Sequence, residues 1–145
     1  MLDVITQALM DLKWNKMWTH YGRQSLNIAN EGKNEPDRYC FITGLIRDWS
    51  RRQYNNYTAS LRISKASKIQ KHQLLMQLAS MYIKEYNPDF TYTSIQFAKC
   101  MKTPKHKDKN NVGDSVIVAF GDYTGGGLIM YDEEGNEHIH DIYHK

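Results

Sequence analysis

The sequence predicts an α+β fold, with helices in the first part of the chain and an antiparallel sandwich or barrel toward the C-terminus. Two observations predict it. Residues 67–86 carry apolar side chains at helical spacing. After residue 88, short runs of aromatic and β-branched residues alternate with turn sequences. Helices followed by consecutive strands are typical of α+β proteins, and 145 residues fit one domain.

Two helices are expected. The first covers residues 2–18, where apolar side chains recur at near-helical spacing: Leu2, Ile5, Leu9 and Leu12. The second begins at Ser67 and Gln70, which fit a capping box. Its apolar face contains Leu74, Leu75, Leu78, Met81, Tyr82 and Tyr86. It ends at Asn87-Pro88, since proline disfavours helical geometry in the preceding residue. We expect this helix to pack on a sheet.

The strands are predicted from composition. Expected strands cover residues 90–97, 115–120, 128–131 and 137–143, with turns at 121–127 and 133–136. Residues 19–40 are polar around Pro36 and are expected to form a loop. The apolar segment 40–49 is interrupted by Gly44, so a strand and a helix both fit it.

Composition restricts the class of protein. No window approaches the roughly 18 to 20 apolar residues of a membrane span. The N-terminal segment MLDVITQALMDLKW lacks the basic start and continuous apolar core of a secretion signal. An intracellular location, cytoplasmic or nuclear, is therefore expected. Cys40 and Cys100 fit two reduced thiols, with one disulfide as the alternative.

Charge is unevenly distributed along the chain. Residues 1–109 contain 18 Lys and Arg against 9 Asp and Glu, whereas residues 110–145 contain 1 against 7. The basic part suits a polyanionic partner such as nucleic acid. It equally suits a solvated lysine-rich surface, or a surface complementary to the acidic part.

The polar loop 104-PKHKDKNNVGDS-115 carries the clearest chemical signal. His106 and Asp108 are two residues apart, so in an extended segment both side chains lie on one face and can reach one ion. One imidazole and one carboxylate are two members of the 2-His-1-carboxylate triad that binds Fe(II) and leaves positions open. A His-x-Asp triplet also occurs by chance in polar loops. Lys105, Lys107 and Lys109 alternate with the two ligands and are expected to face solvent, although they could steer an anionic substrate.

Together with the strand at 115–120 and the following 121-GDYTGGGLIMYD-132, this loop resembles the 2-oxoglutarate/Fe(II)-dependent dioxygenase superfamily. The Tyr-x-Gly-Gly-x-Leu turn is similar to the prolyl-hydroxylase type. The His-x-Asp-x-Asn-Asn-x-Gly-x-Ser run is similar to the branch that oxidises thymine or methylcytosine. The resemblance covers roughly residues 88–145.

The resemblance implies N-terminal helices packed on a partial double-stranded β-helix, or jelly roll, in a single domain over residues 1–145. Helical support would cover about 1–87 and jelly-roll strands about 88–145. It implies Fe(II) as cofactor and 2-oxoglutarate as co-substrate, with His106 and Asp108 as iron ligands. Substrate hydroxylation would accompany conversion of 2-oxoglutarate to succinate. The substrate is unknown; a nucleic-acid base and a protein side chain both fit.

The superfamily also uses a later histidine and an Arg or Lys that binds 2-oxoglutarate. The stretch His138–His144 is read as preceding the missing ligand strand, and if one of its histidines is the third ligand, His140 and His144 are the candidates. The cationic counterpart is not found, so the last barrel strands are expected to be missing. Open strand edges would then favour self-association.

Two alternatives to an active oxygenase remain open. One is a non-catalytic nucleic-acid-binding module that uses the basic residues and base stacking on Trp14, Trp18 and Trp49. The core is the other expected location of these tryptophans. The second is an inactive remnant of an oxygenase.

Overall fold

The computed structural model describes residues 2–14, 39–48, 61–99, 103, 105–108 and 111–143. The chain divides into two compact units, Met1–Met101 and Lys102–Lys145. Helices and antiparallel sheets are both present, as expected for an α+β protein. Across the described ranges, no helix is long and apolar enough to cross a membrane.

The first unit is built on a three-stranded antiparallel sheet with the order β2-β1-β3. Its strands are β1 (Tyr39–Arg47), β2 (Leu61–Ile63) and β3 (Ser94–Lys99). In the register between β1 and β3, Phe41 lies opposite Phe97. Segment 40–49, for which strand and helix both fitted, is therefore strand through Arg47. Two strands lie within residues 1–87, so the expected order of helices first and strands afterwards is not observed.

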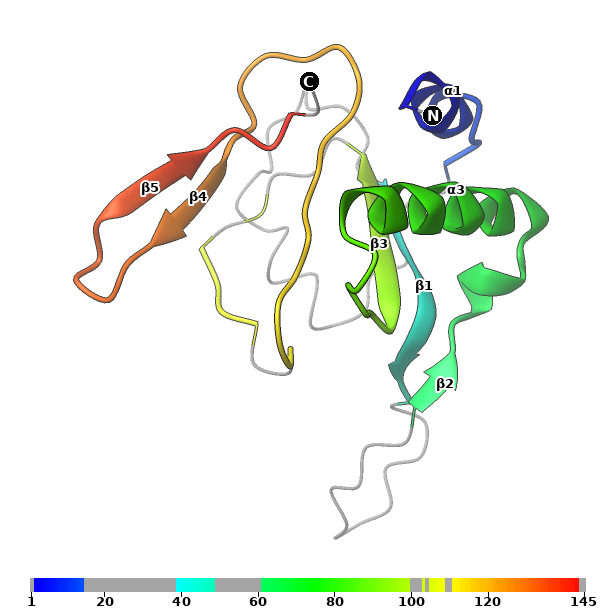
Figure 1. Ribbon diagram of the computed structural model, residues 1–145, viewed down its shortest axis with the longest axis horizontal. Helices are drawn as coiled ribbons and strands as arrows, with labels where there is room; N and C mark the ends of the chain where they lie inside the picture. Colours follow the sequence, from blue (N-terminus) through cyan, green and yellow to red (C-terminus); the bar gives the residue numbers. More distant parts are fainter. Residues whose placement is uncertain are drawn as a thin grey trace, which may run out of the picture. The chain divides into compact units, whose positions relative to one another are not determined.

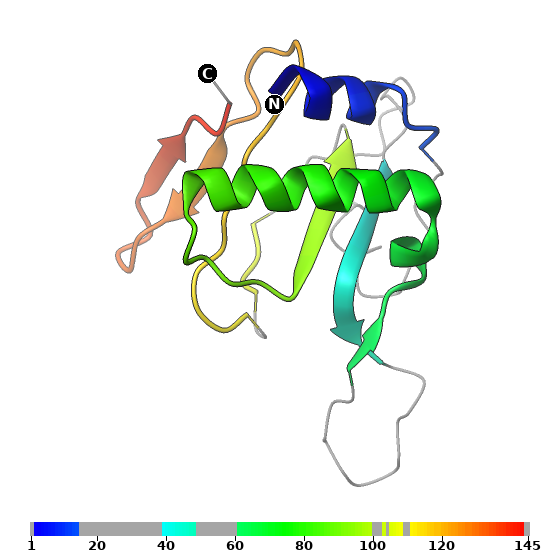
Figure 2. The same cartoon turned by 45° about the vertical axis from the view of Figure 1, so that its right-hand side comes forward.

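The described part of this unit also contains α1 (Leu2–Met10), the 3-10 turn η3 (Lys65–Lys68) and α3 (Gln70–Tyr86). In Figures 1 and 2, α3 lies across β1 and β3, and Figure 2 shows α1 beside α3. Leu75 of α3, Leu12 and Phe97 of β3 form the buried cluster between these elements. The prediction that the long helix packs on a sheet is confirmed.

The start of the long helix differs from the prediction. Ser67 lies in the 3-10 turn, whose N-cap is Ser64, and α3 has Ile69 as its N-cap without a side-chain capping bond. The capping box of Ser67 and Gln70 is therefore wrong. The Ser67 hydroxyl accepts a 2.8 Å hydrogen bond from the Gly44 amide instead. The predicted end of the helix is confirmed, because α3 stops at Tyr86 before Asn87.

Gly44 joins the sheet to this turn. Its φ is +90°, and its carbonyl accepts a hydrogen bond from the Ser64 amide at 2.9 Å. A Cβ on Gly44 would lie 2.3 Å from the Thr93 carbonyl oxygen. Glycine is therefore required here both by backbone conformation and by close packing of two chain segments.

The second unit contains an antiparallel hairpin of β4 (Leu128–Tyr131) and β5 (Glu137–His140) (Figure 1). The predicted strand at 128–131 and turn at 133–136 are confirmed. The strand predicted at 137–143 ends at His140, and Tyr143 forms an isolated parallel bridge with Ala119. Among the described residues, that bridge is the only strand-like pairing within 115–120, so the strand predicted there is wrong.

Some other predicted elements are shorter or lie outside the described residues. The first helix ends at Met10 rather than 18, and residues 15–18 are not among those described. The strand predicted at 90–97 starts at Ser94 and extends to Lys99. The loop predicted at 19–40 lies outside the described residues except for Tyr39 and Cys40, which belong to β1. Cys100 also lies outside them.

Candidate metal centre

The loop of the second unit brings His106 and Asp108 together. The Nε2 atom of His106 lies 3.4 Å from Oδ1 of Asp108. Their side chains are 37% and 63% exposed. The i, i+2 spacing predicts that the two side chains share a face, and the structure places them in that relationship.

The carboxylate of Asp108 has a second contact inside the loop. Asn111 donates a hydrogen bond from Nδ2 to Oδ2 of Asp108 at 3.2 Å. The Asn111 contact therefore does not involve Oδ1, the oxygen nearer His106, which can donate an electron pair to a metal ion. Hydrogen bonds of this kind hold ligating carboxylates in position around metals. Asn111 therefore acts within the loop.

The distance between the donors can be compared with the geometry of a metal ion. An ion about 2.1 Å from each of two donors at right angles separates those donors by about 3.0 Å. The observed 3.4 Å corresponds to a donor–metal–donor angle of about 108° at the same bond lengths. The separation is thus one that two ligands of the same ion can have.

The described residues supply no third ligand next to this pair. Among them, no group of three or more His, Cys, Asp or Glu side chains could hold a metal. His140 lies on β5 opposite Leu128 of β4 and is not part of such a group. His144 is outside the described ranges.

His138 has another partner. Its Nε2 lies 3.1 Å from Oδ2 of Asp132, at the start of the turn between β4 and β5. Asp132 also accepts hydrogen bonds from the Glu134 and Asn136 amides and the Asn136 side chain. These hydrogen bonds, the one with His138 foremost, lower the pKa of Asp132 to about 2. His138 therefore closes the hairpin turn.

Two glycines of the segment before β4 have the positive φ that the predicted turn needs. Gly125 and Gly126 have φ values of +74° and +75°. A Cβ on Gly127 would lie 2.9 Å from Cγ2 of Ile139 and 3.2 Å from the His140 carbonyl oxygen. The close approach allowed by Gly127 is thus to strand β5. Nearby, the Tyr123 ring lies edge-on to the Tyr143 ring, with centroids 5.2 Å apart.

Lys105 is exposed, as expected for the loop lysines, but its ammonium also contacts an aromatic ring. Its Nζ lies 3.4 Å from the centroid of the Tyr131 ring on β4. Tyr131 in turn donates a hydrogen bond from its hydroxyl to Oε1 of Glu137 at 3.0 Å, and this bond raises the Tyr131 pKa. Sequence reasoning missed this contact. An aromatic residue on the predicted strand 128–131 and a lysine directly before His106 were the available signals.

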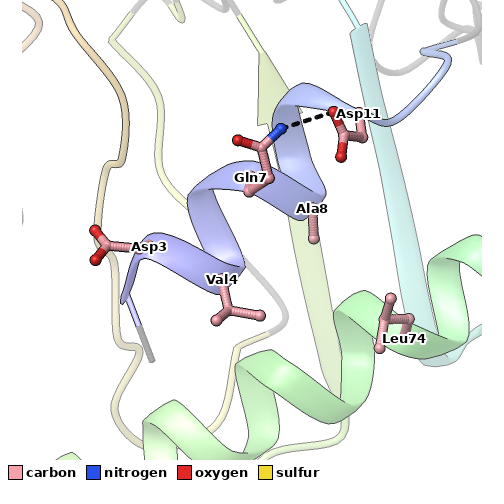
Figure 3. A pocket seen from close by; sticks show the side chains of 6 residues that line it. All are labelled: Asp3, Val4, Gln7, Ala8, Asp11 and Leu74. Atoms are coloured by element: carbon pink, nitrogen blue, oxygen red, sulfur yellow. Dashed lines mark hydrogen bonds between the residues drawn. The ribbon is translucent and has the colours of Figure 1, made fainter.

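The first unit has a groove of its own between α1 and α3 (Figure 3). Figure 3 shows Val4, Ala8 and Leu74 directed toward the space between the helices, while Asp11 accepts a hydrogen bond from Gln7. Asp3 also lines the groove. Two carboxylates and an apolar floor do not match a phosphate backbone, so this groove gives no support to nucleic-acid binding.

Trp14 lies beside the core of the first unit. Its ring centroid is 5.4 Å from that of Phe41, and its Nε1 donates to the Leu9 carbonyl at 3.1 Å. This position agrees with the expectation that the tryptophan lies in the core. Trp18 and Trp49 lie outside the described residues.

Comparisons with protein-family models, with curated proteins and with solved structures found no match to this chain.

Proposed function

We propose that this protein is an Fe(II)- and 2-oxoglutarate-dependent oxygenase that hydroxylates its substrate, with His106 and Asp108 as two iron ligands. The observation that carries the proposal is the 3.4 Å separation of His106 Nε2 and Asp108 Oδ1 in an open loop. A neutral imidazole and a carboxylate are ligands that suit Fe(II). Bound iron and 2-oxoglutarate would supply the oxidation chemistry.

The protein's own residues have defined roles in this proposal. His106 would present Nε2 to the ion, and Asp108 would present Oδ1. Asn111 holds the other carboxylate oxygen at 3.2 Å, which limits rotation of Asp108. The third ligand would come from His144 or His140. A base of nucleic acid and a protein side chain are the substrate classes that we retain.

The jelly roll belongs to the same proposal. Its support is the antiparallel β4–β5 hairpin that directly follows the glycine-rich turn. Each strand of this two-stranded sheet carries exposed apolar residues, among them Ile129, Met130 and Ile139. Such residues suit strands that gain further cover in a barrel or in self-association.

Anaerobic titration with Fe(II) and then 2-oxoglutarate tests the proposal. We expect the weak visible charge-transfer band of the iron chelate, above a protein-free control. The band should be lost in His106→Ala and in Asp108→Ala, and retained in Lys107→Ala, which lies between the two ligands. Absence of a band in the wild-type chain, or a band that survives His106→Ala, would contradict the assignment. Succinate release after admission of oxygen tests turnover separately.

A further inference from the structure

The loop that carries His106 and Asp108 is attached to the hairpin through the residue directly before it. The ammonium of Lys105 lies 3.4 Å from the Tyr131 ring centroid, well inside the roughly 6 Å range of a cation–π interaction. The lysine stem and the aromatic ring thus join a loop to a strand. Fixing the Lys105 side chain restricts the backbone that bears His106.

The ring that receives Lys105 is itself held by the sheet. Tyr131 of β4 and Glu137 of β5 are cross-strand partners, and the Tyr131 hydroxyl donates to the Glu137 carboxylate at 3.0 Å. Because the Tyr131 hydroxyl donates to a carboxylate, its phenolic oxygen and the ring become more electron-rich. An electron-rich ring face favours a nearby cation. A continuous series of contacts therefore runs from Glu137 through Tyr131 to Lys105.

We propose that Lys105 and Tyr131 are positioning residues, which hold the loop against β4 so that His106 and Asp108 converge on one divalent cation. This inference rests on the proposed function, because it assigns a role toward the same two donors. Lys107 serves as the comparison. It is an exposed lysine of the same loop, also next to His106, and it carries the same charge.

Charge repulsion and positioning predict opposite changes in metal affinity when Lys105 is removed. A lysine next to a dication repels it, so removing either lysine should strengthen metal binding if charge were its whole effect. If Lys105 holds the loop in place, its removal should weaken binding. The sign of the change therefore distinguishes the two roles.

The experiment measures the affinity of the full chain for Mn(II), by the loss of the free-ion electron paramagnetic resonance signal. We expect Lys105→Met to weaken binding about two- to fivefold, the range of an exposed cation–π contact. Lys105→Arg should restore wild-type affinity, since guanidinium also stacks on aromatic rings. Lys107→Met should leave affinity unchanged or increase it. Tyr131→Leu should weaken Mn(II) binding as much as Lys105→Met does, and Tyr131→Phe should weaken it less.

A second measurement observes the contact without metal. The ε-methylene protons of Lys105 should show an upfield ring-current shift, present in Tyr131→Phe and absent in Tyr131→Leu. Lys105 protons at ordinary shifts, or equal Mn(II) affinities of Lys105→Met and Lys107→Met, would overturn the positioning role while leaving the proposed function intact. No Mn(II) binding by the wild-type chain would instead overturn the proposed function, and this inference with it.

Discussion

The Gly44 amide donates a 2.8 Å hydrogen bond to the hydroxyl of Ser67, and this bond connects the central strand of the sheet to the turn that precedes α3. The Ser67 hydroxyl also lies 2.9 Å from that of Ser64, and the Ser64 amide donates to the Gly44 carbonyl at 2.9 Å. Both serines are buried. The junction between β1 and the helical segment is therefore a closed polar network.

Gly44→Ala should strongly destabilise the first unit. A φ of +90° costs a non-glycine residue about 1–2 kcal/mol, and the new Cβ would also lie 2.3 Å from the Thr93 carbonyl oxygen. We expect a total loss of about 3 kcal/mol or more in the free energy of unfolding, measured by urea denaturation. A loss below about 1 kcal/mol would be incompatible with the contact between Gly44 and the Thr93 carbonyl.

Ser67→Ala should destabilise the same unit for a different reason. It leaves the Gly44 amide without its acceptor in a part-buried position, which costs about 1–3 kcal/mol. Ser80→Ala is the matched control, because it removes an exposed hydrogen bond between Ser80 and Tyr92. The control should change the free energy of unfolding by about 0.5 kcal/mol or less. Equal effects of the two substitutions would show that the buried network contributes no more to the free energy of unfolding than an exposed hydrogen bond does.

Stability should depend on pH through His72. This histidine is buried, stacks on the Phe41 ring at a centroid distance of 3.9 Å, and has its Nδ1 3.0 Å from the Ala66 carbonyl oxygen. Burial lowers its pKa below the ordinary 6.5. The unfolded chain therefore binds a proton at a higher pH than the folded chain does.

The free energy of unfolding should consequently be fully retained above pH 6.5 and decrease as the pH falls below that value. Denaturation curves between pH 5 and 8 on the wild type and His72→Phe would measure this dependence. The phenyl ring preserves the stack on Phe41 and cannot titrate. If both proteins lose stability equally on acidification, His72 is not the group responsible.

The hairpin turn should tolerate acid well. Asp132 accepts hydrogen bonds from His138, Asn136 and Glu134, which lower its pKa from 3.8 to about 2. Its contribution should be present above pH 3.8 and lost only as the pH falls toward 2. The carbon-13 shift of the Asp132 carboxyl, followed by NMR during an acid titration, should give a midpoint near the lower value. A midpoint at the ordinary 3.8 would mean that these bonds do not form in solution.

Local sequence signals predicted the features that depend on neighbouring residues. The end of α3 follows from Pro88, the hairpin turn from residues 133–136, and the proximity of His106 and Asp108 from their i, i+2 spacing. Each is decided within a few residues of the chain.

Features that depend on distant contacts could not be predicted in this way. Ser67 looked like a helix cap, but its hydroxyl is taken by Gly44, 23 residues earlier. The apolar run at 115–120 has strand composition, yet within the described residues its only partner is at the Ala119–Tyr143 bridge. A third metal ligand would also come from a distant segment, and the spacing of His106 and Asp108 carries no information about it.

The β1–β3 pairing has a consequence for the order of folding events. Thr43 and Ile95, partners in that pairing, are 52 residues apart, whereas Tyr131 and Glu137 in the hairpin are only 6 apart. Closing a short hairpin takes about 1–10 μs, while pairings of high contact order form more slowly because a large chain loop must close first. On the ribosome, β1 would emerge well before its neighbour β3 exists. Until then the edge of β1 that pairs with β3 has no partner strand, and unpaired strand edges are prone to aggregation.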